Sequence, residues 1–173
     1  MIDVDCSPTA VRFAEAFCPQ ASFAIQDLRA LHLNASFDAI VLLDVLEHIM
    51  PKDIAHLMTR LASHMKKGGL LIISVPSTNL SLEPRHYQHF TPQTLRLAVQ
   101  EYIDVSRIEG LHECGLHGFV YQCAGHFATL LLPLRSLPGV RTRYRFLAEY
   151  YERRVAQCEP EKAMSLLAVC IKK

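Results

Sequence analysis

The residues best suited to chemistry are carboxylates and histidines that directly follow apolar runs. Asp44, Glu47 and His48 stand at positions i, i+3 and i+4, just after the apolar run FDAIVLL. In a helical turn these side chains share one face, where they could hold a divalent cation or supply a base. The same three residues could instead cap and solvate the start of a helix.

Two further carboxylates, Asp5 and Asp27, lie at the ends of short apolar segments. A carboxylate at the carboxyl tip of a strand can accept two hydrogen bonds from a ribose diol, which would suit Asp5. Asp27 could accept a hydrogen bond from the exocyclic amine of an adenine. Each also has a structural interpretation, because Asp5 can cap the helix that begins at Ser7 and Asp27 can start a turn.

Histidines supply the third set of candidates. His48, His86 and His89 all follow apolar runs, and the last two lie in the segment RHYQHF. Histidine ionises close to neutral pH, so each of the three could take a proton from a reacting group. Each could equally hold its ring in place by a hydrogen bond to the backbone.

Alternating apolar runs and amphipathic segments predict the elements that position these residues. Strands are expected over 1–4, 22–26, 37–43, 70–75, 103–111 and 166–171. Helices are expected to begin at Ser7–Pro8 and at Thr91–Pro92, where a capping hydroxyl precedes a proline. Another amphipathic helix should end at Lys66, Lys67 and Gly68. Apolar strands joined by helices through short turns predict βαβ units and therefore an α/β fold with a parallel sheet.

Composition narrows the class of function. The 173 residues suit one domain. The 18 Lys and Arg nearly balance the 17 Asp and Glu, so the net charge of +1 gives no drive toward nucleic acid or an anionic membrane. No glycine precedes Gly68, which excludes a glycine-rich phosphate-binding loop from the first third of the chain.

The cysteines and one uncharged stretch bear on location. Six cysteines are spaced singly and predict buried thiols in a reducing cytosol, hence a cytoplasmic protein. Residues 115–134 lack acidic and basic side chains other than histidine, but glycines, histidines and a proline interrupt them. The apolar part is far shorter than the roughly 20 residues a spanning helix needs. We therefore expect no integral contact with a membrane.

The order of these segments resembles a known family. VDCSPTAVRFA is followed by the strand end at Asp27–Leu28, then by SFDAIVLLDVLEHI, MKKGGLLIISVPS and HYQHFTPQTLRLAV. This series is similar to the class I S-adenosylmethionine-dependent methyltransferases, above all to the small-molecule branch that includes ubiquinone-biosynthesis O-methyltransferases. The resemblance covers Met1 to about Leu111 and the final run SLLAVCIKK. It implies a Rossmann-like, mostly parallel sheet with helices on both faces.

The resemblance also implies roles for individual residues in binding S-adenosylmethionine. Asp5 would bind the ribose hydroxyls, and Cys6 would flank the adenine. Asp27 would meet the adenine amine with the backbone of Leu28 nearby. Leu43 would line the methionine end of the cofactor.

Metal and proton chemistry are implied by the same resemblance. Some relatives of the quinone pathways hold a magnesium ion with an acidic-x-x-Glu-His motif, which Asp44, Glu47 and His48 match. The loop that carries His86 and His89 is where relatives meet the methyl acceptor. His48, His86 and His89 are therefore the candidate bases.

One part of the family pattern is missing. The first strand and its glycine-rich turn should precede Met1, so we expect an N-terminally truncated form of the fold. In the family that strand lies between the strands ending at Asp5 and Leu43. Either the chain is part of a longer protein, or its sheet has closed over the gap. Exposed strand edges would favour self-association.

The predicted organisation is a single domain with a core over 1–114, a helical insertion or lid over 115–165 and a final strand over 166–173. The leading functional hypothesis is an S-adenosylmethionine-dependent methyltransferase acting on a small hydrophobic or amphiphilic acceptor. The alternative is a catalytically inactive binding or regulatory subunit that has lost the cofactor loop. A third hypothesis is an interfacial module in which residues 127–134 touch a lipid surface.

Overall fold

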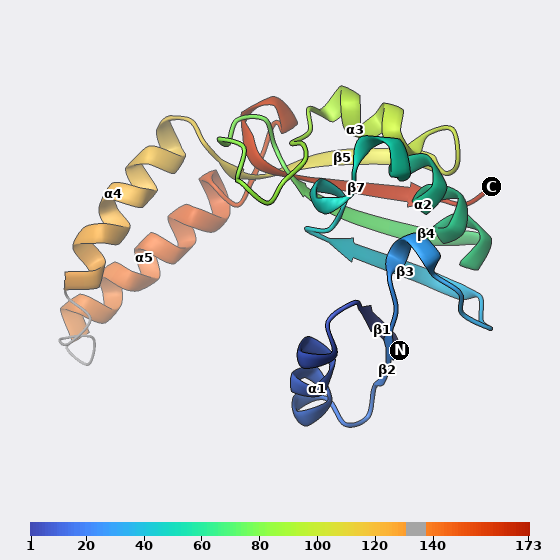
Figure 1. Ribbon diagram of the computed structural model, residues 1–173. Helices are drawn as coiled ribbons and strands as arrows, with labels where there is room; N and C mark the ends of the chain where they lie inside the picture. Colours follow the sequence, from blue (N-terminus) through green and yellow to red (C-terminus); the bar gives the residue numbers. More distant parts are fainter. Residues whose placement is uncertain (131–137) are drawn as a thin grey trace.

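The computed structural model describes residues 1–130 and 138–173 and shows strands alternating with helices (Figure 1). The strands are β1 (Ile2–Asp5), β2 (Ser22–Ile25), β3 (Phe37–Leu43), β4 (Met65–Pro76), β5 (Asp104–Glu113), β6 (Gln157–Cys158) and β7 (Ala163–Ile171). The helices are α1 (Pro8–Phe17), α2 (Pro51–His64), α3 (Pro92–Val99), α4 (Leu116–Leu130) and α5 (Pro138–Arg154). Short 3₁₀ turns are η1 (Leu28–Ala30), η2 (Leu46–His48) and η4 (Pro160–Lys162). The predicted α/β class is confirmed.

The described strands form two sheets. β1 and β2 make a two-stranded parallel sheet, and the larger sheet has the strand order β3-β4-β7-β5-β6. β3 and β4 pair in parallel, whereas β7 runs antiparallel to both β4 and β5. Because β4 and β5 each oppose β7, they point the same way as each other and as β3. The larger sheet thus keeps one common direction for β3, β4 and β5, with β7 reversed between two of them.

Helices α2 and α3 cover one face of the larger sheet. Leu71 and Ile73 of β4 are fully buried and share a core with Leu57 of α2 and Leu95 of α3. On the opposite face Val41 of β3 is 55% exposed. In the described part of the chain, the predicted coverage by helices is therefore seen on one face of this sheet.

Both predicted proline helix starts are confirmed. Ser7 Oγ accepts a hydrogen bond from the N–H of Ala10 at 3.3 Å and begins α1. Thr91 and Thr94 cap α3 reciprocally, because the side chain of each accepts a hydrogen bond from the backbone N–H of the other. A hydroxyl before a proline therefore fixes where each helix begins.

The predicted end of α2 at residues 66–68 is wrong. The helix ends at His64, and Met65 is extended with its side chain 2% exposed in the core. Residues 66–68 belong to β4, where Lys66 pairs with Asp38 of β3 at 2.9 Å. Gly68 has a φ of +73°, so this glycine allows a bend in the strand and does not mark a helix end.

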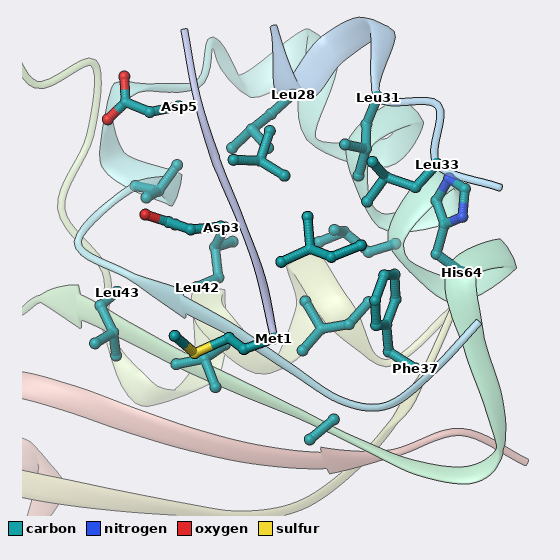
Figure 2. Close-up of a pocket in the computed structure, with 17 residues that line it drawn as sticks. Met1, Asp3, Asp5, Leu28, Leu31, Leu33, Phe37, Leu42, Leu43 and His64 are labelled. Atoms are coloured by element: carbon teal, nitrogen blue, oxygen red, sulfur yellow. The ribbon is translucent and has the colours of Figure 1, made fainter. Parts of the chain in front are cut away.

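A cavity lies between β1 and β3. β1 pairs with β2, and β3 pairs with β4, but β1 and β3 do not pair with each other in the described sheets. Direct pairing of β1 with β3, one of the two alternatives considered from the sequence, is therefore not seen in the described sheets. The strands line a cavity of about 550 Å³ whose walls include Met1, Leu28, Leu31 and Leu42 (Figure 2).

The range 115–165 holds α4 and α5, which lie side by side and extend away from the sheets (Figure 1). β7 begins at Ala163 and not at 166, because its first residues already pair with the end of β5. The stretch 127–134 of the interfacial hypothesis runs into residues outside the described part of the chain. None of the described helices is long and apolar enough to cross a membrane.

The cysteines differ in exposure. All six are free, as their single spacing predicts. Cys170 is buried in the core, whereas Cys6, Cys114 and Cys123 are exposed. The prediction of buried thiols is therefore wrong for these three. Cys6 and Cys114 follow strand ends, where the chain leaves the sheet, and Cys123 lies on α4.

Candidate functional site

Four of the five residues expected to contact a cofactor line one cavity of about 490 Å³. They are Asp5, Cys6, Asp27 and Leu28, and His48 lines the same cavity. Leu43 lines the adjoining 550 Å³ cavity, and Asp5 and Leu28 belong to the walls of both. The strand ends of β1, β2 and β3 thus bring the predicted residues to two adjoining cavities.

Asp5 ends β1 and is half-buried at the cavity wall. Its Oδ1 accepts a hydrogen bond from the N–H of Ser7 at 2.6 Å, and its backbone oxygen accepts one from Gln26 at 3.2 Å. The carboxylate therefore caps the start of α1 and faces the cavity at once. Capping α1 therefore does not remove Asp5 from the cavity wall, and both roles considered from the sequence remain open to it.

Asp27 is held by a partner that the sequence analysis missed. Both carboxylate oxygens accept hydrogen bonds from Arg29 Nε at 3.0 Å, and Oδ2 also accepts one from Nη2 at 2.6 Å. These hydrogen bonds lower the pKa of Asp27 from 3.8 to about 2. Asp27 is consequently a carboxylate at neutral pH and can act only as an acceptor. The sequence did contain a signal for this ion pair, because Asp27 stands two residues before Arg29 at a turn.

Asp44 does not join the cluster expected of it. It has a φ of 50° and precedes η2, so it does not share a helical face with Glu47 and His48. Its Oδ1 accepts a hydrogen bond from Ser74 Oγ of β4 at 2.7 Å. Asp44 is therefore bonded to the neighbouring strand, and the trio predicted from the sequence is not formed.

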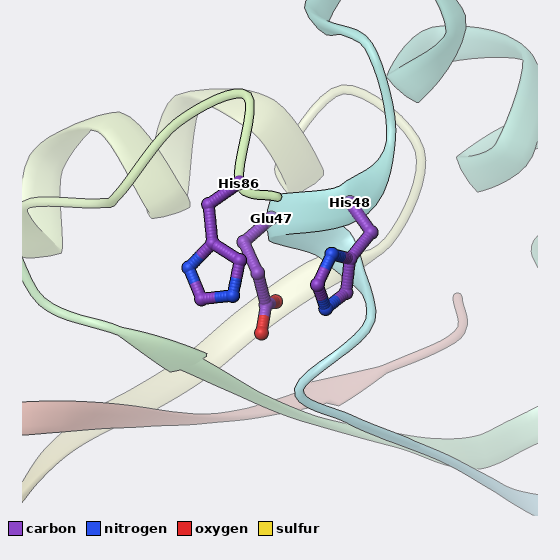
Figure 3. Close-up of side chains that lie close together, drawn as sticks. All are labelled: Glu47, His48 and His86. Atoms are coloured by element: carbon purple, nitrogen blue, oxygen red, sulfur yellow. The ribbon is translucent and has the colours of Figure 1, made fainter. Parts of the chain in front are cut away.

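His86 takes the third place beside Glu47 and His48. One ligand atom from each of these residues lies within 4.8 Å of the other two. The two imidazole rings contact each other edge to face, with centroids 4.7 Å apart, and Figure 3 shows the Glu47 carboxylate beside them. The backbone N–H of Tyr87 donates to the carbonyl of Glu47 at 2.8 Å and holds the loop against η2. This contact could have been predicted from the strands, because η2 follows β3, the loop follows β4, and the two strands are parallel neighbours.

Glu47 is the buried member of the cluster. Its side chain is 1% exposed, and its Oε2 has no hydrogen-bond partner among the described residues. Burial raises the pKa of this carboxyl, while His48 and His86 oppose the rise. Glu47 is therefore a buried acid that faces two imidazoles.

Hydrogen bonds assign the tautomers of the three histidines. Carbonyl oxygens can only accept, so His48 Nδ1 donates to Arg85 at 3.0 Å and His89 Nδ1 donates to Leu80 at 3.2 Å. His89 Nε2 must then accept from His86 Nδ1, which lies 2.8 Å away. In the neutral rings, Nε2 of His48 and of His86 each carry a lone pair. His89 uses both ring nitrogens and holds His86 in place.

Comparisons with known proteins agree with this fold. A family model described as a methyltransferase domain matches residues 2–103. The chain is similar to the N-methyltransferase NodS from Bradyrhizobium japonicum WM9, with 14% identity, a TM-score of 0.60, and coverage of 99% of this chain and 72% of NodS. A NodS complex with S-adenosyl-L-homocysteine gives 13% identity, a TM-score of 0.61, and coverage of 99% and 65%.

A further solved structure is a SAM-dependent methyltransferase from Archaeoglobus fulgidus. It shares 17% identity with a TM-score of 0.62, over 99% of this chain and 75% of its own length. No curated protein sequence matches the chain. At such low identities the likeness to solved structures establishes the fold, while the family model covers more than half of the sequence.

The chain therefore belongs to the methyltransferase-domain family. Its Rossmann-like fold is that of the class I S-adenosylmethionine-dependent methyltransferases, and it is a methyltransferase by family. S-adenosylmethionine is the cofactor of that class.

Proposed function

We propose that this protein binds S-adenosylmethionine in the two adjoining cavities and transfers its methyl group to a small acceptor. The observation that carries the proposal is that Asp5, Asp27 and Leu28 line one cavity together with His48. Family membership supplies the class of reaction. The cavity volumes of about 490 and 550 Å³ fall in the usual range for small-molecule sites.

In this proposal Asp5 accepts hydrogen bonds from the ribose hydroxyls, as a carboxylate at a strand tip can. The ionised Asp27 accepts one from the adenine amine, and Leu28 and Cys6 flank the base. Leu43 contacts the methionine end from the adjoining cavity. The Asp27–Arg29 pair supports the assignment because it fixes the carboxylate at the cavity wall.

His48 is proposed as the group that takes the acceptor's proton. Its Nε2 carries a lone pair, because Nδ1 donates to Arg85, and the ring lines the cofactor cavity. The methyl group leaves the sulfonium sulfur for the acceptor atom, and the electron pair of the broken bond stays on sulfur. The acceptor's proton passes to His48. His86 is the second candidate base, and His89 positions it.

The proposed acceptor is hydrophobic or amphiphilic. Residues 115–165 are proposed as a lid, and in that range Leu116, Phe119 and Val120 of α4 are exposed. Exposed apolar side chains on this proposed lid favour an apolar partner. The donor is already activated, so aligning the acceptor is the main task left to this surface.

We further propose a cytoplasmic location and self-association through strand edges. The six free cysteines suit a reducing compartment. In the described sheets β1 and β3 each pair on one side alone, which leaves their other edges able to accept a strand. Analytical ultracentrifugation of the purified protein tests the second point, and a purely monomeric protein at all concentrations would contradict it.

Isothermal titration calorimetry with S-adenosylmethionine and S-adenosylhomocysteine tests the proposed function. We expect both to bind, and Asp5→Ala to weaken binding by about 10-fold or more because a hydrogen bond to a charged group is lost. Glu15→Ala is the matched control, since it removes an exposed carboxylate of α1 that lines neither cavity. Absence of heat with both compounds would overturn the proposal and favour the inactive subunit.

A further inference from the structure

Three side chains direct acceptor atoms toward one point beside the cofactor cavity. Ligand atoms of Glu47, His48 and His86 lie within 4.8 Å of one another. Figure 3 shows a ring nitrogen of each histidine turned toward the carboxylate of Glu47. In a tetrahedral zinc site two ligand atoms lie roughly 3.4 Å apart, so these side chains would have to approach one another by up to about 1.4 Å to form a coordination sphere.

The hydrogen bonds around the rings prepare both histidines as ligands. His48 donates from Nδ1 to Arg85, and His86 donates from Nδ1 to His89. A histidine that ligates a metal commonly donates its other ring N–H in this way, which fixes the tautomer and the orientation of the ring. Both rings consequently present the lone pair of Nε2. Leu80 completes the chain of hydrogen bonds by accepting from His89.

Glu47 supplies the second, independent observation. Its side chain is 99% buried, and its Oε2 has no partner among the described residues. An unpaired buried carboxyl is costly unless it is hydrogen-bonded or coordinates a cation. In the neutral rings of His48 and His86 the Nε2 atom carries a lone pair and offers this carboxyl no hydrogen-bond donor. A cation between the three residues would satisfy all three acceptors at once.

We propose that Glu47, His48 and His86 form a binding site for a divalent first-row transition metal ion such as zinc. Two imidazoles and one carboxylate suit zinc or iron, whereas magnesium prefers oxygen ligands. The magnesium trio expected from sequence does not fit, because Asp44 is bonded to Ser74. Three protein ligands leave coordination positions open.

The site opens toward the cofactor cavity, because His48 is exposed and lines it. A metal ion and a proton would compete for the same Nε2 lone pair of His48. The metal-bound protein and the protein with His48 ready as a base are therefore mutually exclusive states. Metal binding does not depend on methyl transfer, and it is measured without cofactor or acceptor.

Calorimetry with zinc chloride, and separately with magnesium chloride, tests the site in the full chain. We expect one equivalent of zinc to bind and magnesium to bind far more weakly. His86→Gln should lower zinc affinity by more than the roughly 10–100-fold that loss of an outer hydrogen-bond partner costs. His64→Gln is the matched control, because His64 also bonds a backbone carbonyl but lies outside the cluster.

Glu47→Gln is the second variant, since it keeps the shape of the buried side chain and removes its charge. It should also lose zinc affinity, with circular dichroism reporting that the fold is retained. Zinc that binds equally well to the wild type and to His86→Gln would be held elsewhere, for example by cysteines, and would overturn the proposal. So would a wild-type protein that takes up no zinc.

Discussion

The five-stranded sheet and the two-stranded N-terminal sheet bury their side chains very differently. The larger sheet and its helices share one core, in which Leu57, Ile73 and Leu95 are fully buried. In β1, α1 and β2, Val11 is the one hydrophobic residue classed as buried, while Phe13 and Phe17 are 68% and 71% exposed. Packing therefore stabilises the larger sheet far more than the smaller one.

The proposed sites divide along the same line. Asp5 and Cys6 belong to the weakly packed N-terminal part, whereas Glu47 and His86 stand on segments that follow β3 and β4 of the larger sheet. The proposed nucleoside contacts therefore belong to the part of the molecule with less buried packing, which we expect a bound ligand to stabilise. The histidine cluster is carried by a part that is already fixed.

The largest effect is expected from truncating the core of the larger sheet. Ile73→Ala should lower the free energy of unfolding by about 2–5 kcal/mol, because it removes buried atoms and leaves a cavity. Val41→Ala on the opposite face, at 55% exposure, should cost less than about 1 kcal/mol. Urea denaturation followed by circular dichroism measures both. Equal losses would show that the two faces of the sheet are packed alike.

Hydrogen exchange of the backbone amides compares the two sheets directly. Amides of β1 and β2 should exchange at least about tenfold faster than those of β4 and β7, which corresponds to about 1.4 kcal/mol in opening free energy. Addition of S-adenosylhomocysteine should slow exchange in β1 and β2 more than in β4 and β7. Uniform protection across both sheets would mean that they open as one unit, against the comparison drawn above.

Two helix caps give a matched test at smaller scale. Thr91→Ala removes the capping box of α3 and should lower the free energy of global unfolding by about 1 kcal/mol. Ser7→Ala removes the cap of α1, and most of its cost should appear as local opening of the N-terminal part. Thermal melting measures the first, and hydrogen exchange of α1 the second. A larger fall in melting temperature for Ser7→Ala would reverse the expected ranking.

The smallest effect concerns pH and the exposed Asp27–Arg29 pair. The pKa of Asp27 is lowered to about 2 in the folded protein, so the pair stabilises fully above pH 3.8 and loses its effect as pH falls through about 2. The pair should contribute little to the free energy of unfolding, because its side chains are 57% and 43% exposed and solvent screens their attraction. Arg29→Gln should return the pKa of Asp27 toward 3.8 in a carbon-detected NMR titration. An unchanged pKa would show that Arg29 is not the cause.

Much of the fold could be predicted because its signals are local. Ser7–Pro8 and Thr91–Pro92 mark helix starts by a hydroxyl cap and a fixed proline φ, and FDAIVLL and LLIISV have the apolar continuity of buried strands. The end of α2 was predicted wrongly, because two lysines followed by a glycine are typical of a helix end. Burial of Met65 and its pairing with β3 place these residues in a strand instead.

The sequence by itself determined the α/β class, the family resemblance and the placement of Asp5, Asp27 and His48 after strand ends. Those features depend on residue types within a few positions of one another. Only the tertiary structure decided that β7 runs reversed between β4 and β5, and that β1 and β3 stay apart around a cavity.

The tertiary structure also decided the composition of the histidine cluster. Asp44 and Glu47 are close in sequence, yet Asp44 bonds to Ser74 of the neighbouring strand. His86 lies far along the chain but meets Glu47 because two parallel strands end at the same edge of the sheet. Contacts of this kind depend on which strands pair across the sheet, and the spacing of the residues in the sequence does not predict them.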